Sequence, residues 1–180
     1  MAVIVVGGAG CGVGKTLLVC GVLAALPERD WIAVKIASHP HGAGKAVWEE
    51  NEPGEGTDTA RYLAAGARRA FLLTAADDTA MKHALDELRK RIERRDNLII
   101  ESNRVLNSLE PDLCLLLRTE ADGAAAKASF DKAISMADAL IINGTADAYR
   151  DKLQPEFELA RLECISPALE CWVRGRLVYC

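Results

Sequence analysis

The sequence predicts an α/β fold in which helices flank a mostly parallel central sheet, giving three layers. Short aliphatic runs alternate with longer segments of helical periodicity, which is the pattern of successive βαβ units. The chain has 180 residues, 50 % of them hydrophobic and 27 % charged, which suffices for one substantial core. We therefore expect a single domain over residues 1–180.

The expected elements follow this alternation in order. We predict strands at 2–6, 31–37, 70–73, 97–101, 112–117 and 139–143. We predict helices at about 14–26, 57–65, 79–94 and 125–136. The third of these helices has a basic last turn, which is expected to be a solvated face that complements the helix dipole. The segment 38–56 combines glycine and proline with polar residues, so we expect a long functional loop there, and 155–180 is too weakly periodic to assign.

A glycine-rich segment directly after the first predicted strand points to phosphate binding. Residues 9–16 read AGCGVGKT, which matches a P-loop with Ala9 in place of its usual first glycine. Backbone N–H groups of such a loop and the start of its helix hold phosphate, while Lys15 reaches the β- and γ-phosphates and the Thr16 hydroxyl lies on Mg²⁺. The alternative is a glycine-rich turn that binds nothing. The expected contacts in this P-loop NTPase fold are Ala9, Gly10, Cys11, Gly12, Val13, Gly14, Lys15, Thr16 and Leu17.

An acid at the end of a neighbouring strand is expected to hold the Mg²⁺, directly or through water. Glu101 ends the apolar run 98–100, at the carboxyl edge of the sheet where ligands of open α/β sheets gather. Ser102 and Asn103 follow and are candidates for hydrogen bonds to phosphate or metal-bound water. The alternative is that Glu101 caps the strand and points to solvent.

The helix predicted from residue 57 begins with Thr57 or Asp58 as its N-cap. Capping alone is one interpretation, and the other is that Asp58 and Arg61 face the cleft, where Arg61 contacts an anionic substrate or the transferring phosphate. On the second interpretation, the metal residues are Thr16, Asp58 and Glu101, and the catalytic residues are Lys15, Arg61 and Glu101.

Three further residues are candidates for the substrate cleft. Lys35 stands in an apolar strand, and because lysine is rarely buried unpaired, it reaches a phosphate, a carboxylate or the sheet edge. His39 and His41 follow in the glycine-rich loop, as transition-metal ligands, substrate contacts or surface groups. Asn143, at the end of the last predicted strand, is an expected nucleotide contact. The guanine-reading pattern Asn-Lys-x-Asp is poorly matched after it, so GTP and ATP both stay open.

The bulk properties exclude several classes of partner. A net charge of −4 argues against general binding to nucleic acid or anionic membranes, and the longest apolar stretch, 17–26, is too short to span a bilayer. The P-loop lies so near the start that no signal segment is expected before it, which favours a cytoplasmic protein. The six cysteines form no CxxC pair, so neither a zinc site nor a disulfide framework is expected. Oxidation or alkylation of Cys11 in the loop would block nucleotide binding.

Four segments together resemble one known family. The P-loop, AVKIASHPH, GTDTARYLAAGA and LIIES are similar to the molybdopterin-guanine dinucleotide biosynthesis protein B group, over about residues 1–143. The group belongs to the P-loop class that includes signal-recognition, metallochaperone and dethiobiotin synthetase proteins. The resemblance implies GTP binding with Mg²⁺, a homodimer, and assistance to a molybdopterin nucleotidyltransferase or another molybdoenzyme maturation partner. The chain departs from the group at Ser38 and in having Ser102-Asn103 after Glu101.

Three functions fit these patterns. The first is a slow nucleoside triphosphatase, GTP-dependent by resemblance, that assists molybdenum cofactor maturation, since no residue is an obvious strong general base. The second is an ATP-dependent small-molecule kinase or ligase related to dethiobiotin synthetase, with Lys35 binding the substrate. The third is a regulatory domain that binds nucleotide without hydrolysing it.

Overall fold

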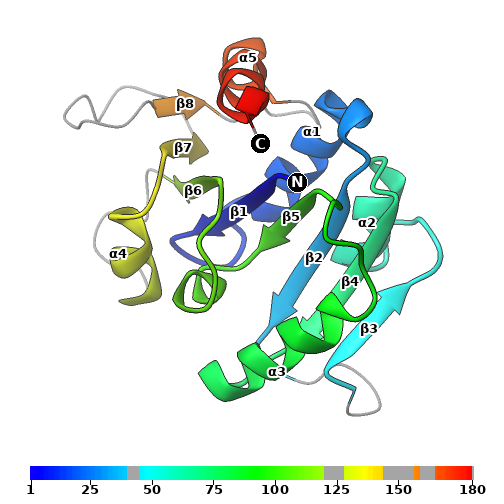
Figure 1. Cartoon of the computed structure of the whole chain (residues 1–180). Helices are drawn as coiled ribbons and strands as arrows, with labels where there is room; N and C mark the ends of the chain where they lie inside the picture. The colour runs from blue at the N-terminus through cyan, green and yellow to red at the C-terminus, as the bar shows by residue number, and fades with distance from the viewer. Residues whose placement is uncertain (40–44, 120–127, 144–155, 159–164, 180) are drawn as a thin grey trace.

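The computed structural model describes residues 1–39, 45–119, 128–143, 156–158 and 165–179, and an eight-stranded sheet lies at its centre (Figure 1). The strands lie side by side in the order β3-β4-β2-β5-β1-β6-β7-β8, and every neighbouring pair is parallel except β3 with β4. The strands are β1 Val3–Gly8, β2 Ile32–Ala37, β3 Val47–Glu50, β4 Arg69–Thr74, β5 Leu98–Glu101, β6 Leu113–Thr119, β7 Ala139–Asn143 and β8 Glu156–Glu158. The helices are α1 Lys15–Ala25, α2 Asp58–Ala64, α3 Asp78–Arg89, α4 Ala128–Ile134 and α5 Pro167–Arg176, with 3₁₀ turns at η1 Pro27–Arg29, η2 Arg104–Asn107 and η4 Leu177–Tyr179.

Helices cover both faces of this sheet (Figure 1). On one face α1, α2 and α5 pack over side chains such as Ile4 and Val6 of β1. On the other face α3, α4 and η2 pack over the alternate side chains, Val3 and Val5. Because successive residues of a strand point to opposite faces, a strand that is apolar throughout fills both cores. The predicted three-layer α/β architecture is confirmed.

Three expectations about individual elements need correction. The segment 38–56 is not loop throughout, because β3 forms within it and pairs antiparallel with β4. The third predicted helix ends at Arg89, so most of the basic residues expected in its last turn lie beyond it. The unassigned tail contains β8 and α5, whose start carries Ser166 as N-cap and Pro167 in the first turn. Residues 125–127 of the fourth predicted helix lie outside the described part of the chain.

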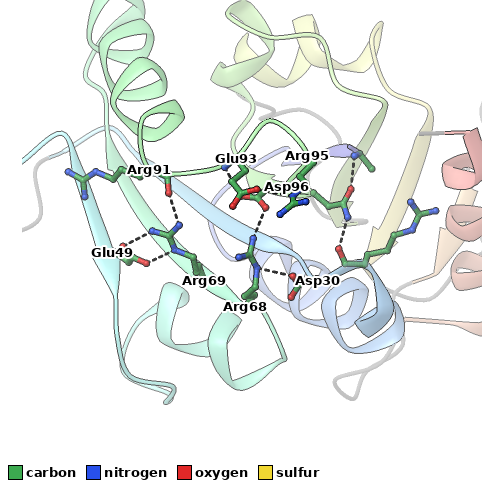
Figure 2. Close-up of polar contacts among 11 residues, drawn as sticks. Asp30, Glu49, Arg68, Arg69, Arg91, Glu93, Arg95 and Asp96 are labelled. Carbon is green, nitrogen blue, oxygen red and sulfur yellow. Dashed lines mark hydrogen bonds and ion pairs between the residues drawn. The ribbon is translucent and has the colours of Figure 1, made fainter.

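Ion pairs join the strands at the edge of the sheet where the parallel strands begin (Figure 2). Arg68 Nε lies 2.9 Å from Asp30 Oδ2, and its Nη2 donates to Asp96 Oδ1 at 2.7 Å. Arg69 donates to both carboxylate oxygens of Glu49, at 2.7 and 2.9 Å. We call Asp30, Glu49, Arg68, Arg69 and Asp96 the amino-edge network. Within the described part of the chain, no helix has the length and apolar composition needed to cross a bilayer.

Candidate functional site

The loop between β1 and α1 is shaped to receive an anion. Gly12 and Gly14 have φ values of 75° and 101°, in the left-handed region that glycine adopts without strain. Gly14 is the N-cap of α1 and no side chain caps the helix, so its first N–H groups face the loop. The positive end of the helix dipole adds to these donors. The Lys15 ammonium donates to the Gly10 carbonyl across the loop at 2.5 Å.

The base of this loop is held in place by one amide side chain. Asn103 Oδ1 accepts from the Gly8 N–H at 2.7 Å, and its Nδ2 donates to the Gly8 carbonyl at 2.9 Å. A Cβ on Gly7 would lie 2.4 Å from Asn103 Oδ1, and one on Gly8 would lie 2.7 Å from Val13 Cγ2. A side chain at either position would therefore force its neighbours to shift, at Gly7 the amide of Asn103 that holds the loop. Asn103, which the sequence suggested as a phosphate or water ligand, positions the loop.

Five polar side chains meet at the carboxyl edge of the sheet, beside the start of α1. Thr16 Oγ1 lies 3.1 Å from Asp58 Oδ1 and 3.0 Å from Glu101 Oε2. Lys35 Nζ lies 3.0 Å from Asp58 Oδ2 and also pairs with Glu101 Oε1, while the Tyr62 hydroxyl donates to Glu101 Oε2. Glu101 is only 2 % exposed, which excludes the alternative of a strand cap that points to solvent. We call Thr16, Lys35, Asp58, Tyr62 and Glu101 the carboxyl-edge network.

Electrostatics fix the protonation states within the carboxyl-edge network. Burial lowers the pKa of Lys35, but the Glu101 and Asp58 carboxylates outweigh this effect and leave the pKa above its usual value. Burial raises the pKa of Asp58, but hydrogen bonds and charge from Lys35 outweigh it and leave that pKa below its usual value. Burial and the Glu101 charge raise the pKa of Tyr62 well above its usual value. Lys35 is therefore a cation, Asp58 an anion and Tyr62 a neutral donor at neutral pH.

The oxygen atoms of this network fit Mg²⁺ better than a softer metal. The Thr16 hydroxyl lies within hydrogen-bonding distance of one carboxylate oxygen of Asp58 and one of Glu101. Mg²⁺ prefers oxygen ligands and is held in proteins by one or two carboxylates together with substrate phosphate. Across the described residues, no group of three or more His, Cys, Asp or Glu side chains could hold a metal ion. Thr16, Asp58 and Glu101 offer only oxygen donors, the kind that Mg²⁺ takes together with phosphate oxygens.

A cleft of about 650 Å³ opens over the loop and the carboxyl-edge network. It brings together most of the residues predicted from the sequence: Gly10, Cys11, Gly12, Gly14, Lys15, Thr16, Leu17, Lys35, Asp58, Arg61 and Glu101. Thr57, whose Oγ1 accepts from the Ala60 N–H at 3.0 Å, is the N-cap of α2, so Asp58 is left to face the cleft. Arg61 lies at the rim of the cleft, where its Nε is 3.5 Å from Glu55 Oε2.

Other predicted residues are placed elsewhere. Ala9 and Val13 are each 2 % exposed and do not line the cleft. His39 is exposed outside it, and His41 lies outside the described residues. The Asn143 side chain donates to the Val13 carbonyl at 3.0 Å, so it holds the backbone of the loop. Asp147, which follows Asn143 one position later than the guanine-reading pattern places its acid, also lies outside the described residues.

Tyr62 and Arg104 are members of the site that were not predicted from the sequence. Tyr62 lies one helical turn after Asp58 on α2, and this spacing of four residues is a signal that both face the same side. Arg104 lines the cleft from η2, where its Nη1 donates to the Ala75 carbonyl at 2.8 Å. No sequence pattern marks Arg104, because the contact depends on how η2 meets the end of β4.

No protein-family model and no curated protein matches this chain. Among solved structures, LpxK from Aquifex aeolicus in complex with ATP is similar, with a TM-score of 0.60 and 19 % identity over 88 % of this chain and 53 % of that chain. HypB from Helicobacter pylori in complex with nickel has a TM-score of 0.42 and 20 % identity over 78 % of this chain and 63 % of that chain, a likeness too weak to carry an argument. The likeness to LpxK shows the fold, that of the P-loop NTPases. This chain spans about half the length of the LpxK chain.

Proposed function

We propose that this protein binds a Mg²⁺–nucleoside triphosphate in the cleft over residues 10–17 and slowly transfers its γ-phosphoryl group to water. The observation that carries the proposal is the position of the Thr16 hydroxyl, at the open start of α1 and within 3.1 Å of two carboxylates. A glycine-rich turn that binds nothing would have no need for two acids at this point, one of them, Glu101, buried. Phosphate binding explains both the uncapped helix and the acids beside it.

Each residue has a role that follows from its contacts. Lys15 exchanges the Gly10 carbonyl for the β- and γ-phosphate oxygens, since it already reaches over the loop. Thr16, Asp58 and Glu101 are the residues that would hold Mg²⁺, which when bound neutralises charge on the phosphate oxygens. Arg61 offers a guanidinium at the rim of the cleft for charge that develops on the γ-phosphate.

The turnover is expected to be slow because the cleft holds no well-suited general base. The Glu101 carboxylate is engaged by Lys35, Tyr62 and Thr16, which leaves it little capacity to accept a proton from water. Asp58 has a lowered pKa, which also makes it a weak base. Hydrolysis by positioning and electrostatics alone is consistent with an accessory nucleoside triphosphatase.

The finer assignment follows the sequence resemblance. We propose GTP as the nucleotide and a cytoplasmic, homodimeric accessory role in molybdenum cofactor maturation, with a molybdopterin nucleotidyltransferase as a partner. The LpxK structure was solved with ATP, so ATP stands beside GTP as a candidate. The Asn143 side chain is engaged by the loop backbone, and this contact favours neither base.

A second candidate function is transfer of the phosphoryl group to a small molecule. One observation favours it: a second cavity lies against the cleft and shares Lys35 and Asp58 with it. A kinase needs such a place for its acceptor, whereas an accessory hydrolase does not.

Titration calorimetry with ATP and with GTP, in millimolar MgCl₂ and then in EDTA, tests nucleotide binding. We expect Lys15→Ala to weaken affinity by at least about tenfold, the value of one charge-assisted hydrogen bond. Lys82→Ala on the exposed side of α3 is the matched control and should bind like the wild type. Equal affinity of the wild type and Lys15→Ala, with both folded by circular dichroism, would overturn the proposal.

A further inference from the structure

A second cavity of about 650 Å³ opens beside the P-loop cleft, between the β3–β4 edge of the sheet and the start of α2. Among the described residues, Lys35 and Asp58 line both hollows. A molecule in this cavity would therefore contact Lys35 and Asp58, which also face the P-loop cleft. Asp58 accepts from the Thr16 hydroxyl and pairs with Lys35.

The strand register explains why the two cavities adjoin. Trp48 of β3 pairs with Leu72 of β4, Leu72 with Lys35 of β2, and Lys35 with Glu101 of β5. Residues paired across neighbouring strands point to the same face of a sheet. One row of side chains thus leads from the sheet edge to the P-loop cleft. In order it consists of an aromatic ring, an aliphatic side chain, a cation and a carboxylate.

The lining of the second cavity selects a kind of ligand. Trp48 is 49 % exposed, and together with Leu72 it offers an apolar surface on which a flat ring stacks. Glu50, two residues along the same face of β3, accepts from the Thr57 and Thr59 hydroxyls at 3.0 and 3.1 Å. Its carboxylate is an acceptor for hydroxyl or amino groups on a ring.

The charges of the cavity favour a neutral molecule. Two lysines and two carboxylates line it, namely Lys35, Lys45, Glu50 and Asp58. Because these charges balance, neither an anion nor a cation gains from the cavity as a whole. A flat neutral ring with hydroxyl or amino substituents satisfies both the apolar surface and the carboxylate acceptor.

We propose that the second cavity binds the phosphoryl acceptor, a neutral small molecule with a flat ring and a hydroxyl group. This proposal rests on the proposed function, in its form as transfer to a small molecule. The acceptor hydroxyl oxygen bonds to the γ-phosphorus, and the bond from that phosphorus to the β–γ bridging oxygen breaks. The nucleoside diphosphate leaves with the electron pair, and the hydroxyl proton is released to solvent.

Binding of small alcohols tests the cavity directly. The flat-ring probes are pyridoxine and guanosine, and the ring-free probes are glycerol and serine, each titrated calorimetrically with and without a non-hydrolysable Mg²⁺–nucleotide. We expect at least one flat-ring probe to bind in the millimolar range or tighter, and Trp48→Ala to weaken it by at least about tenfold. Trp48→Phe keeps a stacking surface and should retain most of that affinity. Met136→Ala, at an exposed apolar side chain outside both cavities, is the matched control.

The outcomes separate the two proposals. If no flat-ring probe binds the wild type, if ring-free alcohols bind as well, or if Trp48→Ala has no effect, the cavity assignment is overturned while nucleotide binding stands. If no nucleotide binds the wild type, the proposed function fails first. Incubation of the bound probe with the hydrolysable nucleotide should give the phosphorylated alcohol by mass spectrometry. Binding without that product overturns the assignment as acceptor.

Discussion

Both edges of the sheet carry ion pairs, but the Lys35–Glu101 pair and the Arg69–Glu49 pair differ in the exposed fraction of their side chains. At the carboxyl edge Glu101 is 2 % and the Lys35 side chain 22 % exposed. At the amino edge Arg69 and Glu49 are 28 % and 33 % exposed, and Arg68, 39 % exposed, pairs with Asp30 at 68 % and with Asp96 at 10 %. Exposed pairs contribute little to stability, whereas removal of one partner of a buried pair is costly. Similar contacts thus join neighbouring strands at the amino edge and form a polar site at the carboxyl edge.

Replacement of the lysine at the carboxyl edge should give the largest change in stability. Lys35→Met leaves Glu101 as a buried carboxylate without its cation, so we expect the free energy of unfolding to fall by about 3 kcal/mol. Urea unfolding followed by circular dichroism measures this loss.

Two further variants test whether the burial of the pair explains the size of this loss. Arg69→Met, the matched change at the amino edge, should cost only about 1 kcal/mol because its pair with Glu49 is solvated. The double variant Lys35→Met/Glu101→Gln removes both charges and keeps an acceptor for the Tyr62 hydroxyl, so most of the lost stability should return. Equal losses for Lys35→Met and Arg69→Met would break the distinction between the edges.

A substitution in the close packing beneath the P-loop should give the second-largest loss of stability. An alanine Cβ at Gly7 would lie 2.4 Å from Asn103 Oδ1 and 2.5 Å from Leu116 Cδ2. We expect Gly7→Ala to lower the free energy of unfolding by about 2 kcal/mol through overpacking. Gly56→Ala, where a Cβ meets no atom within 4 Å, is the control and should change it little. A thermal melt in which both variants behave alike would contradict the packing argument.

The smallest effect is a difference in pH dependence between the edges. The pKa of Lys35 is raised above its ordinary value of 10.5, so its stabilisation is complete below that pH and is lost as the pH rises through the folded-state pKa. The advantage of the wild type over Lys35→Met in urea should therefore shrink only as the pH rises above about 10.5. The advantage over Arg69→Met should stay constant there, because the guanidinium remains protonated.

The acid side of the same profile depends on Asp58. Its pKa is lowered from the ordinary value of 3.8, so its contribution is present above that pH and disappears as the pH falls through the folded-state pKa. The Lys35→Met variant loses the cation that lowers this pKa and should show a weaker fall in stability below about pH 4. An unchanged acid slope would show that Lys35 does not set the charge of Asp58.

Local patterns were enough to predict the centre of the fold and most of the residues that gather around the candidate cleft. The glycines and Lys15-Thr16 identify the loop because backbone shape and phosphate chemistry both act within a few residues. Glu101 was predicted because parallel strands all end at one edge of the sheet, so an acid after an apolar run lies near that loop. The start of α2 likewise follows from capping, with Thr57 as the cap.

The parts that were missed depend on contacts between distant segments. Four residues of β3 form a strand only because β4 provides a partner for them. Asn143 was expected at the nucleotide, but its amide is used on the Val13 carbonyl, which only the packing of β7 beside the loop reveals. α5 is different, since its Ser166 cap and Pro167 were visible and the weak periodicity of the tail concealed them.

Helix α1 reaches from one edge of the sheet to the other, over a length of about 16 Å. Its start faces the cleft, and its end is held by Arg174 of α5, which donates to the Ala25 carbonyl and pairs with Glu28. The guanidinium thus stands at the negative pole of the same helix whose positive pole faces the loop. A chain shortened before Pro167 would keep every described cleft residue and still lose this partner of the last carbonyls, so the C-terminal helix secures the far end of the helix that begins at the loop.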